Sequence, residues 1–288
     1  MKLYPIETGN FKLDGGAMFG TIPKSIWQKT NPADGQNKIE LAMRALLIED
    51  GDRLILIDCG IGNKQSEKFF SYYDLWGDYD LDTSLAQYGF SKDDITDVFL
   101  THLHFDHCGG AVQLDTVHGG YELTFKNAKY WSNSVHWEWA TQPNPREKAS
   151  FLPENFMPVK ESGNLNFIDL PSGGNYLKNS PLGFDIIFAD GHTDRQMLPV
   201  IKYKGKTIVY VADLVATVGH IPLVYVMGYD TRPLITMQEK GDFLEKAVQE
   251  DYLFFFEHDP YRELASVAKT EKGILLDSTY SFSEVFGN

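Results

Sequence analysis

The stretch that most constrains this chain is "THLHFDHCGG" at residues 101–110. Its ligand-capable side chains are His102, His104, Asp106 and His107. Side chains alternate along extended backbone, so His102 and His104 point the same way. Asp106 and His107 come where the chain must bend toward two glycines. Burying so many polar groups without partners would cost roughly several kcal/mol each, and a pair of metal ions is the natural partner.

Three further polar residues follow apolar stretches elsewhere in the chain. His192 comes after "FDIIFAD", Asp213 ends "IVYVAD", and His258 ends "LFFFEH". Because layered folds present functional groups at the carboxyl ends of strands, these residues are candidates to complete two ligand sets. The other histidines lie in mixed loop or helical sequence and are expected to be ordinary surface or hydrogen-bonded residues: His118, His136 and His220.

Together these motifs closely resemble the metallo-β-lactamase-fold hydrolases, whose hallmark is H-x-H-x-D-H. The resemblance rests on "THLHFDHCGG", "GHTDRQ", "VADL" and "FEHDP". The stretch "LILIDCGIG" is also similar to the family's early strand-turn element, with Cys59 in place of threonine. The resemblance spans most of the chain and implies an α/β fold, a four-layer αββα sandwich, formed by one domain over residues 1–288.

The resemblance also implies how two divalent metal ions would be held. One ion would be bound by His102, His104 and His192, and the second by Asp106, His107 and His258, with Asp213 bridging both. Asp58 is either a carboxylate that supports a ligating imidazole or a turn-forming residue before Gly60. Nitrogen and oxygen ligands suit zinc, although manganese, iron or cobalt could occupy them. His104 stands where redox-active di-iron relatives carry glutamate, which favours hydrolysis.

Two such ions can share a hydroxide and lower its pKa to roughly 7, which supplies a nucleophile without a serine or cysteine. The implied catalytic residues are Asp106, as a proton relay to the leaving oxygen, and the bridging Asp213. Cys108 follows the motif directly, but no base or oxyanion arrangement around it indicates a thiol nucleophile. We therefore expect Cys108 to be a small packed residue.

Two other stretches are similar to the lactonase branch of the family, which opens N-acyl homoserine lactones (quorum quenching) and includes organophosphate-hydrolysing relatives. These are "DGGAMFGTIPKSIW" at 14–27 and "HIPLVYVMGYDTRP" at 220–233. Their apolar residues, with one from the histidine motif, are expected either to line a pocket for an acyl or aromatic group or to pack in the core: Met18, Phe19, Ile22, Trp27, Phe105, Tyr225 and Met227.

One position departs from the lactonase pattern. Well-studied homoserine lactonases place a catalytic tyrosine three residues after the bridging aspartate, and Ala216 stands there in this chain. The candidates to replace it as a donor to the substrate oxygen are His220, Tyr225 and Tyr229, although none has the expected spacing. A lactone or related ester is the leading substrate class, and an organophosphate triester or aryl ester is the alternative.

Other functions are disfavoured by the composition. A glyoxalase II would need a basic glutathione-binding tail, whereas residues 261–288 contain few positive charges. The net charge of −14 argues against nucleic acid as a partner and against a processing ribonuclease. A non-catalytic metal-binding module would be expected to have lost ligands, and this chain keeps the complete set.

The remaining expectations concern location and assembly. No run approaches 18 apolar residues, the first residues do not read as a secretory signal, and the two cysteines cannot form a disulfide framework. A cytoplasmic protein with a small-molecule ester or lactone substrate and no membrane partner is expected. By analogy with related lactonases, the apolar "MFGTIPKSIW" segment would serve a homodimer.

Local patterns predict several secondary-structure elements. Apolar or alternating stretches predict strands at 2–9, 39–50, 53–60, 98–101, 128–133, 184–190, 197–203, 206–213 and 251–258. Asp50 and Gly51 predict a hairpin turn. Helices are expected near 135–140 and 237–249, the latter with Thr236 and Glu239 as a capping box. Residues 141–181, rich in proline, are expected to be a long surface excursion that forms a lid or pocket wall.

Overall fold

The computed structural model describes residues 1–287, which form two compact units. Unit 1 comprises Met1–Phe11 and Met43–Ser172, and unit 2 comprises Lys12–Ala42 and Gly173–Asn288. The boundaries fall within two long strands, β1 (Lys2–Asp14) and β2 (Lys38–Asp50), so each of these strands contributes residues to both units. That the whole chain behaves as one domain stays a prediction.

Unit 1 is built on a six-stranded sheet with the order β1-β2-β3-β4-β7-β8. Its other strands are β3 (Arg53–Ile57), β4 (Asp97–Phe99), β7 (Lys129–Ser132) and β8 (Leu165–Phe167). The strands from β3 to β8 pair in parallel, whereas β2 and β3 form the predicted antiparallel hairpin. Gly51 in its turn has φ 61°, a left-handed conformation that glycine adopts without strain.

Parallel pairing explains where the histidine motif lies. Parallel strands bring their carboxyl ends to one edge of a sheet, where loops carry functional groups. Asp58 directly follows β3, and Thr101 and His102 follow β4 at that same edge. Short helices then lie between the strands of unit 1: α3 (Glu67–Phe70), α4 (Leu81–Gln87), α5 (Phe105–Cys108), α6 (Ser134–Thr141) and α7 (Pro153–Glu161).

The middle of the proline-rich stretch, residues 151–161, packs into unit 1, whereas most residues of 141–149 and 169–181 are half-buried or exposed. Pro153 stands in the first turn of α7, where its missing N–H is not needed. Phe151, Phe156 and Val159 are almost fully buried in the core of unit 1, together with Leu56 from β3. The predicted lid is therefore wrong for residues 151–161, because apolar residues at helical spacing anchor this segment among the core side chains.

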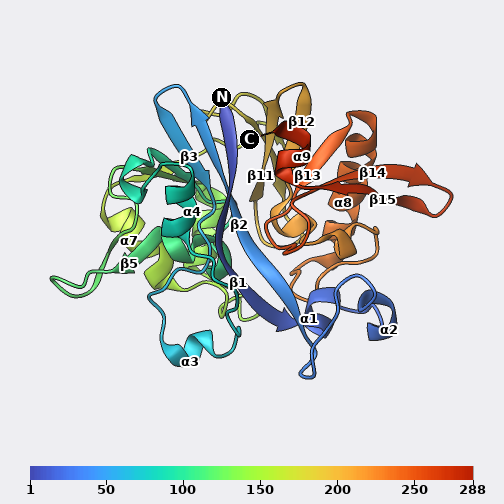
Figure 1. The fold of residues 1–288 in the computed structure, drawn as a ribbon, viewed down its shortest axis with the longest axis horizontal. Helices are drawn as coiled ribbons and strands as arrows, with labels where there is room; N and C mark the ends of the chain where they lie inside the picture. The colour runs from blue at the N-terminus through green and yellow to red at the C-terminus, as the bar shows by residue number, and fades with distance from the viewer. Residues whose placement is uncertain (288) are drawn as a thin grey trace. The chain divides into compact units, whose positions relative to one another are not determined.

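Unit 2 contains a seven-stranded sheet with the order β15-β14-β13-β12-β11-β10-β9. The strands are β9 (Tyr176–Leu177), β10 (Asp185–Ala189), β11 (Gln196–Tyr203), β12 (Lys206–Tyr210), β13 (Tyr252–Phe255), β14 (Leu264–Thr270) and β15 (Gly273–Tyr280). Only β12 and β13 pair in parallel among the described strands of this sheet. The carboxyl ends of β12 and β13 therefore meet at one edge, and Asp213 and His258 follow them. β14 and β15 form a long hairpin (Figure 1).

The helices of unit 2 are α1 (Gly15–Phe19), α2 (Lys24–Trp27), α8 (Pro233–Gln249) and α9 (Phe282–Phe286). The predicted capping box of α8 is wrong, because the helix begins at Pro233 and its first residues precede Thr236. The Thr236 hydroxyl donates instead to the Arg232 carbonyl. The helix packs through an apolar face, since Phe243, Leu244 and Ala247 are buried in the core of unit 2.

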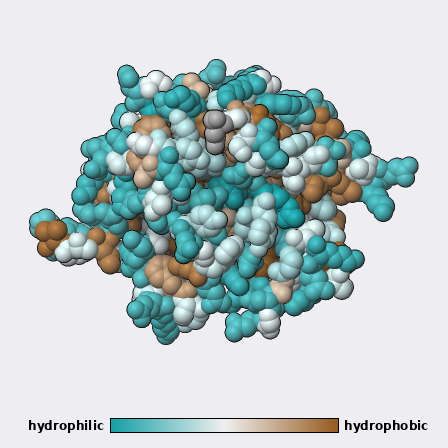
Figure 2. All heavy atoms as spheres, viewed as in Figure 1, coloured by the Kyte–Doolittle hydropathy of each residue, from teal (hydrophilic) through white to brown (hydrophobic). Residues whose placement is uncertain are grey.

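The surface is mostly hydrophilic on the face that Figure 2 shows. Hydrophobic side chains gather on the projecting hairpin of β5 (Val112–Leu114) and β6 (Tyr121–Leu123), where Val117 is 81% exposed. None of the helices formed by residues 1–287 is both long and apolar enough to cross a bilayer.

Candidate metal centre

The histidine motif of unit 1 forms a buried cluster at the end of β4. His104 is the N-cap residue of α5, and Asp106 and His107 lie within that helix. His102 and His107 are fully buried, and His104 and Asp106 are less than a tenth exposed. His102 Nε2 lies 3.0 Å from His104 Nδ1. All four of these side chains belong to buried groups that could hold a metal ion.

Asp58 positions two of these imidazoles, that of His107 by a direct contact and that of His102 through Thr101. One of its oxygens accepts the backbone N–H of Thr101 at 2.8 Å, and the other accepts the Thr101 hydroxyl at 2.6 Å. That second oxygen also lies 3.1 Å from His107 Nδ1. The Thr101 oxygen lies 3.1 Å from His102 Nδ1. Of the two roles expected for Asp58, the geometry matches the supporting carboxylate, because both rings are held at Nδ1 while their Nε2 atoms face the ligand-capable atoms of His104 and Asp106.

A further carboxylate, Glu147, faces His104, and sequence reasoning did not find it. This carboxylate is 3% exposed, and its Oε1 lies 3.4 Å from His104 Nε2. Its Oε2 accepts the Trp139 indole N–H at 2.7 Å and the Asn144 amide at 2.5 Å. In the sequence Glu147 stands in the charged stretch "PREK", which looks like a solvated surface. Only the nearby Trp139, which is partly buried, could have signalled a carboxylate in need of partners.

Unit 2 holds a second ligand cluster around Asp213. This aspartate lies in the 3-10 turn Ala212–Leu214 that follows β12. Its Oδ2 is 3.0 Å from His192 Nε2, and its Oδ1 is 3.0 Å from His258 Nε2. All three side chains are less than a tenth exposed. A carboxylate whose two oxygens face two different imidazoles is the arrangement that a bridging ligand requires.

The outer nitrogens of these two histidines are also held. His192 Nδ1 lies 2.9 Å from Asp230 Oδ1, and Asp230 is 1% exposed. His258 Nδ1 lies 2.9 Å from the Ala42 carbonyl oxygen, to which it donates. Asp230 was missed because "GYDTRP" reads as an ordinary turn. Both contacts fix the ring orientation and leave Nε2 facing Asp213.

Helix α8 holds the turn that carries His192. Glu239 accepts the backbone N–H groups of Asp190 at 2.8 Å and Gly191 at 3.0 Å. Arg232 donates to the Asp190 carbonyl at 2.7 Å. A Cβ atom at Gly191 would lie 2.3 Å from the Thr236 backbone nitrogen, so only glycine fits against the helix here. Of the pair Gly191-His192, the glycine is therefore required by close backbone packing and the histidine is the candidate ligand.

The two clusters fit metal ions by the chemistry of their donors. Each of the five imidazoles has one nitrogen engaged by a carboxylate, hydroxyl or carbonyl group and the other directed at a neighbouring ligand-capable atom. Buried nitrogen and oxygen donors of this kind suit zinc and similar divalent cations. Such outer contacts are typical of metal-ligating histidines.

The electrostatics of the cluster in unit 2 also favour a bound cation. Burial lowers the pKa of His192, but Asp213 and Asp230 outweigh it and raise the pKa to about 10. Two buried carboxylates around one imidazole thus attract a positive charge strongly. In the metal-free protein a proton supplies that charge, and a cation would replace it.

We therefore expect metal affinity to rise with pH. The folded pKa of His192 lies above its ordinary value of 6.5, so protonation stabilises the metal-free fold below that pH, and this contribution is lost as the pH rises toward 10. A cation requires the neutral ring, so binding releases a proton and the affinity should increase about tenfold per pH unit for that proton. Zinc competition against a chelator at several neutral and alkaline pH values measures the slope, and a flat profile would contradict this account.

The outer contacts predict a second measurable effect. Glu147→Gln and Asp230→Asn should each weaken metal binding by about 10–100-fold, because each replaces a carboxylate that orients a histidine. Glu138→Gln is the matched control, since Glu138 is exposed on α6. Chelator competition measures the affinities. Equal metal affinities in Glu138→Gln and Glu147→Gln would show that Glu147 does not contribute to metal binding.

The remaining histidines behave as ordinary residues. His118 lies exposed in the turn between β5 and β6. His136 is buried and accepts the Leu103 N–H at 2.9 Å, which holds the backbone between His102 and His104. His220 bonds the Thr217 hydroxyl and the Met18 carbonyl, each at 2.9 Å.

His220 cannot serve as the donor that replaces the lactonase tyrosine. Burial lowers its pKa to about 4, so the ring is neutral at physiological pH. Its single N–H is donated to the Met18 carbonyl, because a carbonyl can only accept. Its ring also stacks on Phe19 at 4.2 Å, and Phe19 stacks on Trp27 at 5.3 Å. For Phe19 and Trp27 the expectation of core packing therefore holds.

Cys108 is the packed residue that the sequence predicted. It is fully buried, its Sγ lies 3.3 Å from the Leu103 carbonyl oxygen, and burial raises the pKa of its thiol to about 12. Phe105, by contrast, packs against other aromatic side chains of unit 1. The centre of its ring lies 4.7 Å from that of Tyr73 and 5.6 Å from that of Phe69, which forms an aromatic patch at the first residue of α5.

The comparisons with known proteins agree with these motifs. Residues 44–258 match the family model of the metallo-beta-lactamase superfamily, so this chain belongs to that superfamily of hydrolases. A probable metal-dependent hydrolase from Staphylococcus aureus is 27% identical, with a TM-score of 0.82 over 96% of this chain and 95% of that chain. No curated protein matches the sequence significantly.

Two further solved structures share the fold at lower identity. AidC, a dizinc quorum-quenching lactonase in complex with a product, is 22% identical, with a TM-score of 0.76 over 97% of this chain and 94% of that chain. The hydrolase AbOPH is 20% identical, with a TM-score of 0.73 over 97% and 94% of the two chains. The predicted metallo-β-lactamase fold and α/β class are thereby confirmed.

Proposed function

We propose that this protein is a dinuclear metal-dependent hydrolase that opens a lactone of the N-acyl homoserine type or a related carboxylic ester. In this proposal the ligand clusters of the two units bind two divalent cations, most simply zinc. One would be held by His102, His104 and His192, and the other by Asp106, His107 and His258, with Asp213 shared.

The observation that carries the proposal is the geometry of Asp213. Its two carboxylate oxygens each lie 3.0 Å from the Nε2 atom of a different histidine. The Nδ1 atom of each of these histidines is held by a hydrogen-bond partner, Asp230 for one and the Ala42 carbonyl for the other. A structural ion pair would need only one such contact. A carboxylate that is shared between two metal ions explains both contacts at once.

When bound, two such cations supply a hydroxide nucleophile at neutral pH and polarise the substrate carbonyl. The protein's own groups then perform the remaining tasks. Asp58 and Glu147 keep the imidazoles of unit 1 in position, and Asp230 does so for His192. The carboxylate of Asp106, which is 8% exposed, is the group available to carry a proton to the leaving oxygen.

The aromatic patch beside the ligands favours an apolar acyl or aryl substituent. Phe105 follows His104 directly and packs edge-on against Phe69 from α3 and at a tilt against Tyr73. Large aromatic surfaces of this kind gain stability by covering apolar groups.

A second candidate function is an organophosphate triesterase or arylesterase. Ala216, which is 1% exposed, provides no hydroxyl where lactonases carry a tyrosine, and His220 has its N–H engaged elsewhere. A substrate with a good leaving group depends less on such a donor. That the solved structure of AbOPH shares this fold is consistent with either substrate class.

A panel of three substrates tests the proposal. N-hexanoyl homoserine lactone, phenyl acetate and paraoxon should be compared with the zinc, manganese and cobalt forms. We expect the lactone to be turned over with the highest kcat/KM. Rapid triester hydrolysis without lactone turnover would favour the second candidate, and no turnover of any of the three would remove the proposal.

The homodimer and the cytoplasmic location remain proposals. The two described cysteines, Cys59 and Cys108, are buried and form no disulfide, which agrees with a reducing compartment. In the segment expected to serve a dimer, Trp27 is buried within unit 2 and Ile26 is 43% exposed. Sedimentation analysis of the purified protein decides the oligomeric state.

A further inference from the structure

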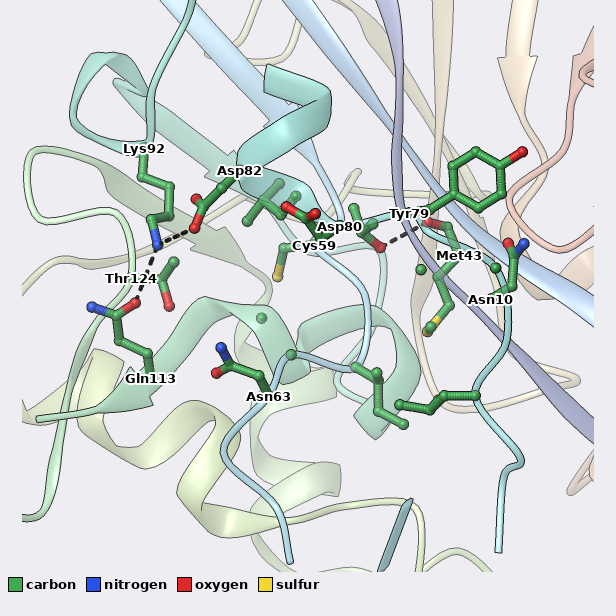
Figure 3. Close-up of a pocket in the computed structure, with 18 of the residues that line it drawn as sticks. Asn10, Met43, Cys59, Asn63, Tyr79, Asp80, Asp82, Lys92, Gln113 and Thr124 are labelled. Atoms are coloured by element: carbon green, nitrogen blue, oxygen red, sulfur yellow. Dashed lines mark hydrogen bonds and ion pairs between the residues drawn. The ribbon is translucent and has the colours of Figure 1, made fainter. Parts of the chain in front are cut away.

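Unit 1 contains a cavity of about 330 Å³ that includes none of the candidate metal ligands. Its wall comes from β1, β2, the turn after β3, the loop before α4 and the segment that follows α5 (Figure 3). This volume lies at the small end of the range for ligand pockets in proteins. The cavity is therefore large enough for a small molecule and separate from the residues assigned to hydrolysis.

The charged side chains of the cavity wall are already paired. Lys92 lies 3.0 Å from Asp82, and it also donates to the Gln113 amide oxygen at 3.4 Å (Figure 3). Asp80 caps α4 by accepting the Thr83 backbone N–H at 2.8 Å and the Thr83 hydroxyl at 2.7 Å. A charged ligand would lose its hydration here without meeting an opposite charge that is available to it.

Three neutral polar groups of the wall lack partners. The Thr124 hydroxyl is buried without a hydrogen bond among the described residues, and the whole residue is only 6% exposed. The side-chain amides of Asn10 and Asn63 also make no hydrogen bond to the part of the chain that the structure describes, and both line the cavity. A buried hydroxyl without a partner is unfavourable, so a ligand that bonds to Thr124 gains binding energy.

The apolar part of the wall is well anchored. Met43 and Ile61 are buried at the cavity, and Trp76 covers it from the loop before α4. The Trp76 indole donates to the Phe11 carbonyl at 3.1 Å, and its backbone N–H donates to the Asn10 carbonyl at 3.1 Å. These hydrogen bonds attach the loop to β1, so the wall of the cavity is held in place without a ligand.

We propose that this cavity is a second ligand site, which takes a small uncharged molecule with amide or hydroxyl groups. Its polar groups bond to Thr124, Asn10 and Asn63, and its apolar part packs on Met43 and Trp76. The paired charges of Lys92 and Asp82 exclude ionic analogues of the same size. The site is independent of the proposed hydrolytic function.

Selective labelling of methionine methyl groups tests this site in the intact protein. The Met43 methyl lies at the cavity, since it is 3.2 Å from the position of a Cβ at Gly9, and Met197 in unit 2 serves as an internal control. Nicotinamide and glycerol are the uncharged probes, and nicotinate and glycerate are their ionic counterparts. We expect the uncharged probes to shift the Met43 signal and leave Met197 unchanged at concentrations up to about 50 mM, well above a Kd of about 1 mM.

Two substitutions complete the test. Thr124→Val should weaken binding of the uncharged probes about 3–10-fold, because it removes one hydrogen-bonding group and keeps the shape. Thr124→Ser should bind as the unchanged protein does. The proposal is overturned if neither uncharged probe shifts Met43, if the ionic probes bind as tightly, or if Thr124→Val binds like Thr124→Ser.

Discussion

Asp213→Ala is expected to lower kcat/KM for the best substrate by at least about 10³-fold, which corresponds to about 4 kcal/mol of transition-state stabilisation. The two oxygens of Asp213 face two different candidate ligands, at 3.0 Å each. Its loss would remove the shared ligand and leave His192 and His258 without the carboxylate that faces their Nε2 atoms. Bound metal should fall together with activity.

Metal analysis of the purified protein and steady-state kinetics test this together. Asp213→Asn keeps the size of the side chain and removes its charge, so it should lose metal as Asp213→Ala does. Asp251→Ala is a suitable control, because Asp251 is exposed and pairs only with Lys206 among the described residues. Full metal content and near-normal kcat/KM in Asp213→Asn would show that Asp213 is not shared between two ions.

The candidate ligand residues carry signals in the sequence, because four of them stand in the dense motif at 101–110 and the other three, His192, Asp213 and His258, each follow an apolar strand. Their outer partners could not be predicted, because a single carboxylate such as Glu147 or Asp230 carries no local pattern. What makes Glu147 special is burial beside Trp139 and His104, and burial arises from tertiary packing. For Asp58 the sequence left two roles open, because its place after β3 suits either a turn-forming residue or a carboxylate that supports a ligating imidazole.

The errors in secondary structure have similar causes. Thr236 and Glu239 have the spacing of a capping box, but Pro233 is an even better first residue for a helix, and α8 starts there. Glu239 therefore does not cap the helix. It accepts the backbone N–H groups of Asp190 and Gly191, in the turn before His192. Residues 141–181 looked like a surface excursion because proline is frequent, yet Phe156 brings α7 into the core. In the first case one local signal was outweighed by another, and in the second a local signal was outweighed by packing.

His107→Ala and His118→Ala make the most direct comparison of ligand and non-ligand histidines. His107 is fully buried, with Nδ1 held by Asp58 at 3.1 Å and Nε2 lying 3.9 Å from the Asp106 carboxylate, whereas the His118 side chain is 82% exposed. We expect His107→Ala to lose at least about 10³-fold in kcat/KM and a large part of its bound metal. His118→Ala should keep both.

The substitution of a buried side chain also leaves a cavity, so activity alone would not identify a ligand. His107→Asn addresses this, because its amide can still bond to Asp58 while it lacks a nitrogen at the Nε2 position. If His107 acts only in packing, His107→Asn should regain metal content and activity relative to His107→Ala. If Nε2 binds a cation, both variants should remain depleted of metal while circular dichroism reports an intact fold. Loss of metal in His118→Ala would show instead that the ligand histidines had been wrongly assigned.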